Sequence, residues 1–351
     1  MPLIDRLNPV VSGVLSRVDA WERTPSRAPS PAEDLSPVRV EPGRWDLRTL
    51  IAVFGPEAPL RYLNLNFAVG LTGLPFDRPE HLGAVPAGQA FDLQVCLEGR
   101  GLHAAHKAYH PRAAYPARRS PGGVELPPLL SFEGTWPDYR AELCLPHEAL
   151  TLELELRSRE GLCWWARNPG LYSHYTSFAS ARLRWRWGRE EGALETPLLH
   201  DHGWGRNLGV LGRGLQLFRY EVLRLPGDAY LVVLVCDGPG GVHLRRTALH
   251  RRLEGPGHRL KLRSFEVLEW ETLPNYRGAP RRLPRRWRTR LRDEAGRELI
   301  LHGALAEEAR PLLGDGFLAA QDYQAEGALL ETLGHTGALE GEGYVEQMGN
   351  P

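Results

Sequence analysis

The sequence contains little cysteine, and the cysteines are far apart. They are Cys96, Cys144, Cys163 and Cys236, and no two of them form a CxxC pair. This spacing does not favour a metal cluster of the zinc-finger type. It is typical of buried thiols in a reducing compartment, and it leaves open whether any of them form disulfide bonds.

The chain also has no net charge and no long apolar run, and its first residues do not show the pattern of a secretory signal. Lys and Arg number 43, as do Asp and Glu, so no overall field attracts nucleic acid or an anionic membrane. No apolar run approaches the roughly 18 residues that a membrane span needs. Residues 1–24 show no basic segment followed by an unbroken apolar core, the pattern of a secretory signal. We therefore expect a soluble, cytoplasmic protein with no nucleic-acid partner.

Several common enzyme signatures are missing. The sequence contains no GxSxG, no GxxxxGKS/T, no HExxH, and no GxGxxG placed between a strand and a helix. These absences argue against serine-hydrolase, nucleotide-dependent and zinc-protease chemistry. We expect a function that needs no cofactor and no metal.

Short segments of alternating polar and apolar residues dominate the sequence and predict β-strands. The 29 prolines and 38 glycines are spread along the chain, as in a protein of many strands and turns. Alternation is clearest in residues 62–67, 91–95, 151–156 and 183–187. Residues 230–237 are apolar on both faces instead, which predicts a strand covered on both sides. The chain is thus predicted to be all-β.

Two features divide the chain into parts. Apolar residues at helical spacing predict a short N-terminal helix that ends at Thr24, and a Pro- and Ser-rich linker follows through Pro37. The polar turn at residues 189–192 predicts a boundary between two β domains of similar size. The predicted parts are residues 1–37, 38–191 and 192–351. Whether the helix packs on the domains or contacts a membrane surface is left open, as is the oligomeric state.

The stretch from His200 to Gly205 places two histidines, an acid, an indole and two glycines within six residues. On an extended strand, His200, His202 and Trp204 share one face, and Asp201 points to the other. The first face suits a polar catalytic pocket or a wet layer of the core. Two histidines at this spacing also suit a metal, but the sequence nominates no third ligand, so no metal site is predicted. We interpret His200 as structural, and His202 and Trp204 as site residues.

Asp237 ends the apolar segment at residues 230–237 and is followed by glycine. Asp-Gly is a common turn pair, so Asp237 is typical of a solvated strand end. In an apolar pocket, burial would instead raise its pKa and let it act as a general acid. Both interpretations stay open.

Aromatic residues gather between positions 164 and 178, among them Trp164, Trp165, Tyr175 and Phe178. Clusters of this kind pack in cores and interfaces. Aromatic walls also stabilise cations through the ring quadrupole. We nominate these four residues, with Tyr344 of the last predicted strand, as ligand-binding residues for a hydrophobic small molecule.

Three segments, taken in order, resemble the lipocalin-like superfamily that includes carotenoid 1,2-hydratases (hydroxyneurosporene synthases), AttH-type proteins and, more distantly, tocopherol cyclase. They are Tyr172–Arg182, His200–Gly205 and Gly343–Glu346, and they cover the middle and C-terminal parts of the chain. The resemblance implies two consecutive β-barrels with a hydrophobic cavity where they meet. The predicted fold class is therefore all-β, with two lipocalin-like antiparallel barrels and a short N-terminal helix.

The resemblance also implies a reaction. In the hydratases, a His and a Trp of this motif, with a Tyr and an Asp on a following strand, are implicated in adding water to a terminal isoprenoid double bond. His202 and Trp204 match the first pair and Asp237 matches the acid, but Val235 stands where the tyrosine is expected. By this resemblance Asp237 would protonate an alkene, Trp204 would stabilise the carbocation, and His202 would orient or deprotonate water.

The sequence thus predicts a cofactor-independent hydratase or cyclase of a hydrophobic, isoprenoid-like molecule. Because Val235 departs from the hydratase pattern, a non-catalytic carrier of a lipid or isoprenoid stays open as an alternative. The carrier would keep the pocket without the chemistry.

Overall fold

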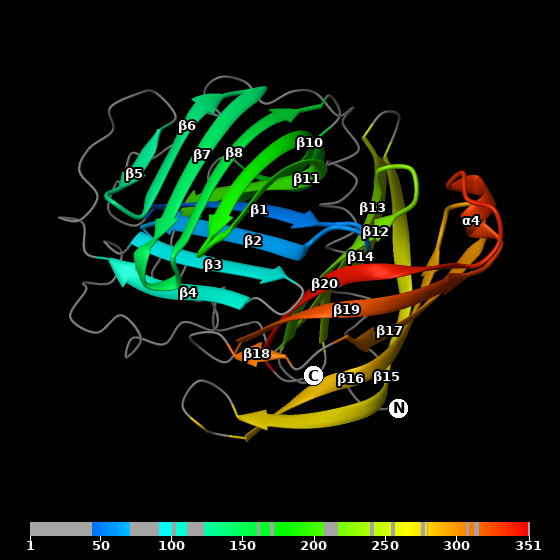
Figure 1. Ribbon diagram of the computed structural model, residues 1–351. Helices are drawn as coiled ribbons and strands as arrows, with labels where there is room; N and C mark the ends of the chain where they lie inside the picture. Colours follow the sequence, from blue (N-terminus) through cyan, green and yellow to red (C-terminus); the bar gives the residue numbers. More distant parts are fainter. Residues whose placement is uncertain are drawn as a thin grey trace.

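A computed structural model gives the arrangement of the chain (Figure 1). It describes residues 44–70, 91–99, 103–110, 123–159, 162–168, 172–206, 217–238, 242–253, 257–274, 278, 280–306, 309–311 and 316–349. The N-terminal helix and linker expected at residues 1–37 lie outside the described residues.

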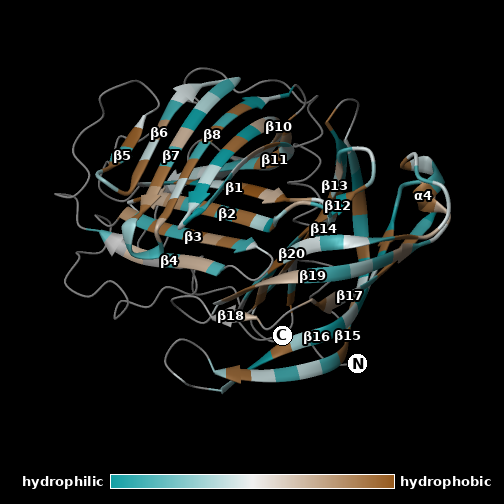
Figure 2. Cartoon of the chain, viewed as in Figure 1, coloured by the Kyte–Doolittle hydropathy of each residue, from teal (hydrophilic) through white to brown (hydrophobic). Residues whose placement is uncertain are grey.

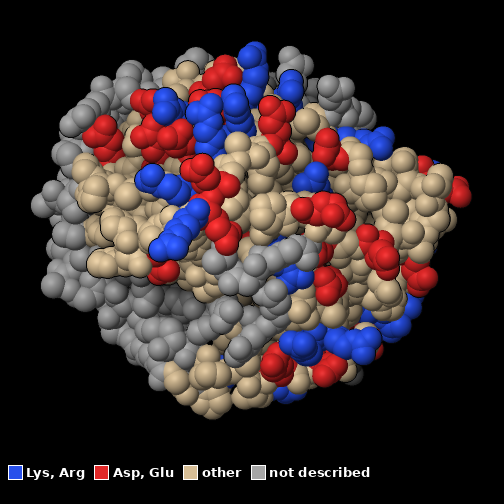
Figure 3. Space-filling model, in the orientation of Figure 1, with Lys and Arg blue, Asp and Glu red and all other residues tan. Residues whose placement is uncertain are grey.

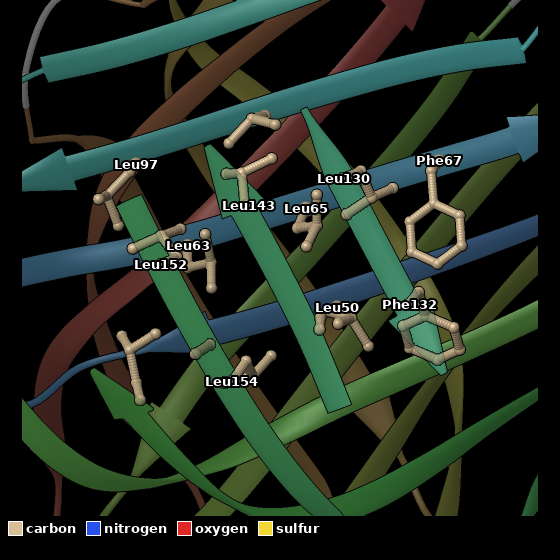
Figure 4. Packing of buried hydrophobic residues seen from close by; sticks show 14 of the residues in the cluster. Leu50, Leu63, Leu65, Phe67, Leu97, Leu130, Phe132, Leu143, Leu152 and Leu154 are labelled. Carbon is tan, nitrogen blue, oxygen red and sulfur yellow. The ribbon is translucent and has the colours of Figure 1, made fainter. Parts of the chain in front are cut away.

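The first sheet has eleven antiparallel strands and stays open. Its order is β4-β3-β2-β1-β11-β10-β8-β7-β6-β5, and β9 pairs with β10 beyond the end of β8. The sheet is curled, so that β6, β7 and β8 lie over β1 and β2 (Figures 1 and 4). Its strands are β1 (Arg44–Val53), β2 (Leu60–Val69), β3 (Phe91–Gly99), β4 (His103–His110), β5 (Val124–Leu126), β6 (Leu130–Thr135), β7 (Asp138–Leu145), β8 (Leu150–Ser158), β9 (Cys163–Asn168), β10 (Tyr172–Trp187) and β11 (Glu190–Arg206), and a short 3-10 helix (Pro146–Glu148) joins β7 to β8.

The second sheet closes into a barrel of eight strands. Its order is β12-β13-β14-β15-β16-β17-β19-β20, and β20 pairs back with β12, while β18 pairs with β19 outside the ring. The helix α4 (Leu329–Thr332) covers one end of the barrel, with Leu329 and Leu330 buried in its core. The strands are β12 (Leu217–Leu225), β13 (Ala229–Gly238), β14 (Val242–Arg252), β15 (His258–Pro274), β16 (Pro280–Arg292), β17 (Glu298–Leu305), β18 (Arg310–Pro311), β19 (Gly316–Glu326) and β20 (Leu339–Gly349).

The fold-class prediction is confirmed, with one difference between the two halves. The second half forms a closed barrel, whereas the first is a half-barrel whose edge strands are β4 and β5. The polar turn at residues 189–192 lies at the hairpin between β10 and β11, inside the first sheet. The chain passes to the second sheet between Arg206 and Leu217. A hairpin turn and a domain boundary share the same polar residues, so composition does not tell them apart.

Alternation along the strands builds the core of the first sheet. The strand β8 has its even-numbered residues buried and its odd-numbered ones turned out, as the sequence predicts. Figure 2 shows this as bands of apolar and polar colour along the strands. We call the inward side of the curled sheet its concave face. Figure 4 shows the leucines and phenylalanines that fill it, among them Leu50, Leu65, Phe67, Leu130, Phe132, Leu143, Leu152 and Leu154.

A separate apolar cluster lies between the half-barrel and the barrel. We call the side of β1, β2, β10 and β11 that faces this cluster the junction face. Ile51, Phe178 and Leu199 belong to it from the first sheet, and Val222 and Val232 from the second. The strand β13 is apolar on both sides because its even positions pack here while its odd positions fill the barrel, which confirms the prediction for residues 230–237.

The four cysteines are free thiols in this structure. No helix of the described part of the chain is both long and apolar enough to span a bilayer.

Candidate functional site

The motif at residues 200–205 lies on β11, between β1 and β10. Its alternation is as the sequence predicts: the His200, His202 and Trp204 rings contact one another in series, with centroids 6.4 Å and 4.7 Å apart. They lie on the concave face. Asp201 points the other way and hydrogen-bonds to Tyr220 of the barrel. The six residues from His200 to Gly205 therefore place side chains on both faces of the first sheet.

His202 is completely buried and has a partner at each ring nitrogen. Its Nε2 lies 2.9 Å from Oδ2 of Asp46 on β1, and its Nδ1 lies 3.3 Å from the hydroxyl of Tyr175 on β10. A carboxylate oxygen only accepts, so Nε2 carries the proton and donates it to Asp46. The remaining nitrogen, Nδ1, forms its hydrogen bond with the Tyr175 hydroxyl, so Tyr175, His202 and Asp46 form one hydrogen-bonded chain.

Arg48 and His200 form the next layer beneath this chain. Arg48 is 1% exposed, and its Nη1 donates to His200 Nε2 at 3.4 Å, while its Nε lies 3.8 Å from Oδ1 of Asp46. Its guanidinium also packs over Phe132 and Tyr139. Burial, followed by the charge of Arg48, holds the pKa of His200 well below its usual range. His200 is thus a neutral acceptor, in agreement with a structural role.

Aromatic rings enclose the hydroxyl end of the chain. The Tyr175 ring packs edge-on against Trp164 at 5.3 Å and against Trp204 at 6.1 Å. The indoles of Trp164 and Trp204 also meet, at 6.0 Å. Trp164 and Tyr175 are buried, whereas Trp204 is partly exposed. Trp204 is therefore the ring of this group that an incoming molecule can meet first.

Asp201, on the junction face, has an unusual environment for a carboxyl group. It accepts hydrogen bonds from Thr176 on the neighbouring strand and from the Tyr220 hydroxyl at 2.9 Å, and Trp165 donates in turn to Thr176. Burial raises its pKa to about 6, although the two hydrogen bonds act in the opposite direction. The sequence assigned no role to this residue beyond its facing away from His202.

Asp237 lies on the second sheet and does not join His202 and Trp204, which lie on the first. It lies on β13 opposite Leu217, whose side chain belongs to the core inside the closed barrel. Arg246 clamps its two carboxylate oxygens at 2.9 and 2.7 Å, and His243 lies 3.1 Å away. The carboxyl group is therefore the acceptor of a two-point ion pair. Val235, at the position of the expected tyrosine, faces the same barrel interior.

The predicted ligand-binding residues divide between the two faces. Trp164 and Tyr175 lie on the concave face beside His202. The other three, Trp165, Phe178 and Tyr344, lie in the cluster between the sheets. Tyr344 accepts from Asn64 at 2.7 Å and donates to Glu346 at 3.0 Å, so it ties β20 to β2. Neighbours in sequence, such as Trp164 and Trp165, separate because a strand alternates its sides.

Hollows lie away from these residues. One, of about 950 Å³, is lined by charged and uncharged residues of β6, β7, β8, β10 and β11 together with Asp228 and Leu253 from the second half of the chain. Figure 3 shows positive and negative side chains interspersed over this region. Another, of about 550 Å³, crosses the outside of β17, β19 and β20. His202, Tyr175 and Trp204 line neither of these. Among the described residues, no group of three or more His, Cys, Asp or Glu side chains is placed to hold a metal ion.

Sequence reasoning missed Asp46 and Arg48. Asp46, Arg48 and the buried Leu50 follow one another at intervals of two residues, so the sequence of β1 alone predicts that the three share a face. Nothing local to β1 indicates that this strand pairs with β11, about 150 residues away, and brings Arg48 opposite His202. Which residue contacts His202 depends on the order of the strands in the sheet, and the sequence of neither strand indicates that order.

Comparisons with known proteins give a consistent answer at the level of fold. No protein-family model and no curated protein sequence matches the chain. The AttH-like protein of Nitrosomonas europaea is similar in structure, with a TM-score of 0.59 at 15% identity over 87% of this chain and 92% of that one. The chain has the fold of that protein.

Two further solved structures share this fold. Kievitone hydratase of Nectria haematococca gives a TM-score of 0.56 at 13% identity, over 88% of this chain and 89% of that one. CghA, crystallised with Sch210972, gives 0.51 at 10% identity, over 93% and 94% of the two chains. The resemblance seen in three sequence segments thus extends along most of the chain as a shared architecture. At these identities the likeness is one of fold.

Proposed function

We propose that the protein is an enzyme of the hydratase or cyclase kind that acts on a hydrophobic small molecule at the concave face of its first sheet. The observation that carries the proposal is the chain Tyr175–His202–Asp46, with hydrogen-bond distances of 3.3 and 2.9 Å, set in an aromatic enclosure. A hydroxyl, an imidazole and a carboxylate in this order move a proton, as they do in the relays of many enzymes.

The same chain serves both reactions of the proposal. With water as the nucleophile, the proton movement adds water to a double bond. With a hydroxyl group of the substrate as the nucleophile, it closes a ring and leaves the mass unchanged. Neither reaction oxidises or reduces the substrate, so we propose that it needs no cofactor. Trp204 and Trp164 offer flat apolar surfaces to an isoprenoid-like or otherwise extended hydrophobic molecule.

The fold likeness supports the class of reaction. One protein of the same architecture is named a hydratase. In the present chain, the departure at Val235 concerns a residue inside the barrel, away from the concave face, and Asp237 beside it is held by Arg246. The proposal therefore gives proton transfer to Tyr175 and His202 and gives Asp237 no part in it.

The test is to incubate the purified protein with a panel of polyenes, terpenoids and prenylated phenols, kievitone among them, and to analyse the products by mass spectrometry. A mass gain of one water identifies hydration, and an isomer of unchanged mass identifies cyclisation. His202→Gln removes the imidazole from the relay and should lower the rate on the order of 100-fold or more. The matched control is His302→Gln, because His302 lies on β17 of the barrel and is partly exposed.

Two outcomes would overturn the proposal. Tight binding of panel members without any product would assign the protein to the carriers. Turnover that His202→Gln and His302→Gln reduce equally would place the reaction elsewhere in the molecule.

A further inference from the structure

The chain between β19 and β20 closes one end of the barrel. It covers residues 327–338 and contains α4 (Figure 1), and we call it the α4 connection. Three of its leucines, Leu329, Leu330 and Leu333, are buried in the apolar cluster inside the barrel, to which Leu231 of β13 also belongs. The α4 connection therefore covers the apolar interior of the barrel with its own apolar side chains.

Three histidines from different elements meet beneath the α4 connection. His250 of β14 is 1% exposed, and its ring meets His335 of the α4 connection edge-on, with centroids 5.8 Å apart. The ring of His258, its cross-strand partner on β15, also lies 5.8 Å away. In the described part of the chain, neither ring nitrogen of His250 and not the Nε2 of His335 has a hydrogen-bond partner. No tautomer of His250 thus gains a hydrogen bond from the protein.

The other surroundings of His250 offer no compensation for a positive charge. Leu231 lies opposite it on β13. Arg252, two positions further along β14, reaches the α4 connection, where a Cβ on Gly334 would lie 2.9 Å from its Nη1. Glu331, the acidic residue of α4, is exposed to solvent. A proton taken up by His250 would therefore add to the charge of Arg252 in a buried place.

Burial keeps the two most enclosed histidines neutral. It lowers the pKa of His250 from 6.5 to about 3, and His335, His258 and Arg252 act in the same direction. Burial, followed by the charge of Arg252, also lowers the pKa of His335. The charged and titratable groups that act on His250 from β14, β15 and the α4 connection are thus all bases. A ring released into water would regain its ordinary affinity for a proton.

We propose that the α4 connection is an acid-opened lid, which stays closed over the barrel while His250 and His335 are neutral and opens when they take up protons. Below pH 6.5 the open state binds protons that the closed state excludes. Each further unit of pH therefore favours the open state about tenfold for each histidine released, down to the range in which the buried ring itself takes up a proton. Opening gives the apolar interior around Leu231 an entrance at this end of the barrel.

Hydrogen exchange of the full chain, followed by mass spectrometry between pH 7 and pH 5, tests the proposal. The backbone N–H groups of Leu330, Leu333, Gly334 and His335 all donate to oxygens of the α4 connection. Four helical residues do not hold such bonds in water by themselves, so these amides should exchange whenever the lid opens. After correction for the intrinsic effect of pH on exchange, we expect their protection to fall about tenfold or more, while the amides of β13 keep theirs.

Substitution of the histidines separates their effect from that of other groups. His250→Leu and His335→Leu should each make the fall in protection smaller by about tenfold, and the double variant should lose most of the dependence on pH. Each single variant tests the proposal by itself. The matched control is His147→Leu, because His147 is exposed on the 3-10 helix of the first sheet. The control should show the same fall as the wild type.

Three results would overturn the proposal. The first is protection of the α4 connection that does not change between pH 7 and pH 5. The second is loss of protection in β13 together with the α4 connection, which would mean that acid unfolds the whole barrel. The third is an equal fall in the double variant and in His147→Leu, which would assign the opening to groups other than His250 and His335.

Discussion

The hydroxyl of Tyr220 donates to Oδ2 of Asp201 at 2.9 Å and joins the closed barrel to the half-barrel. Asp201 precedes His202 on β11, so the strand that presents the candidate catalytic histidine on one face is bonded to the second sheet on the other. Both residues of the bond are buried. A hydrogen bond to a buried carboxyl group contributes more than one between exposed groups, and losing one partner leaves the other unsatisfied.

Replacing Asp201 with Asn should change how stability depends on pH. Folding raises the pKa of Asp201 from 3.8 to about 6, so between these values the unfolded chain has released the proton while the folded chain retains it. The contribution of Asp201 to stability is therefore greatest at acid pH and falls as pH rises through this window. The Asn variant lacks the titration and should gain on the wild type, on the order of 2–3 kcal/mol from about pH 4 to about pH 7.

Urea unfolding at several pH values checks this. The difference in unfolding free energy between Asp201→Asn and the wild type should grow steadily in favour of the variant across the window. A difference that stays constant with pH would show that Asp201 has an ordinary pKa in the folded protein.

Tyr220→Phe should weaken the connection between the two sheets. The substitution keeps the ring in the junction cluster and removes the donor to Asp201, which should cost about 1–3 kcal/mol. It should also raise the pKa of Asp201 further, because the Tyr220 hydrogen bond lowers it. A double-mutant cycle with Asp201→Asn measures the coupling directly. We expect a coupling of about 0.5–3 kcal/mol, and additive effects would mean that the two side chains do not interact in solution.

Asp46→Asn should affect the reaction more than the fold. The amide nitrogen can donate to Nε2 of His202, which places the ring proton on Nδ1, and the amide lacks the charge with which Asp46 would stabilise a protonated His202. By analogy with other carboxylate-to-amide changes behind a catalytic histidine, kcat should fall by roughly 10²- to 10⁴-fold, with KM little changed. The check is steady-state kinetics on the substrate found in the panel, with the thermal midpoint as a control for folding. A variant with the wild-type kcat would remove Asp46 from the mechanism.

The sequence predicted much of the fold because alternation is a local signal. Segments such as residues 62–67 and 151–156 are strands in the structure, and His200, His202 and Trp204 share a face as predicted. The residues around the site could be predicted only in part. Trp164 and Tyr175 were nominated and lie beside His202. Asp46 was not, because its approach depends on β1 pairing with β11, a contact between distant strands.

The contacts of Asp237, the acid suggested by the sequence, also depend on a neighbouring strand. Asp237 ends an apolar strand, a local pattern that fits a desolvated acid as well as a structural one. What decides between them is Arg246 on the next strand, which reaches both of its oxygens across a β-bulge between Cys236 and Asp237. A bulge changes which residues face each other by one position, and neither strand shows it in its sequence pattern.

Two glycines of similar setting should respond differently to alanine. A Cβ on Gly303 of β17 would lie 2.3 Å from the ring of Trp287, which is 1% exposed and has Arg219 packed over it at 4.0 Å. A Cβ on Gly203 of β11 would meet nothing closer than 3.5 Å, an ordinary contact with Trp45. Gly303→Ala should therefore destabilise the barrel by about 1–3 kcal/mol through overpacking, whereas Gly203→Ala should change stability by less than about 0.5 kcal/mol. Equal effects in chemical unfolding would contradict the packing described around Trp287.

Arg219 should be the most sensitive charged residue inside the barrel. Its guanidinium is fully buried, and it donates to Glu221 at 2.7 Å and to Gln347 at 2.8 Å. Arg219→Met keeps the volume but leaves the Glu221 carboxylate buried with Trp287 as its remaining hydrogen-bond donor. Removing one member of a buried ion pair costs about 3–5 kcal/mol, so the variant should unfold at a much lower denaturant concentration.

The double variant Arg219→Met/Glu221→Gln identifies the source of that cost. Glutamine retains an oxygen for the Trp287 indole and carries no charge, so most of the lost stability should return if the uncompensated carboxylate is responsible. If instead the double variant is less stable than Arg219→Met alone, the loss comes from the packing of Arg219 on Trp287 and from its bond to Gln347, and the ion pair contributes little to the barrel.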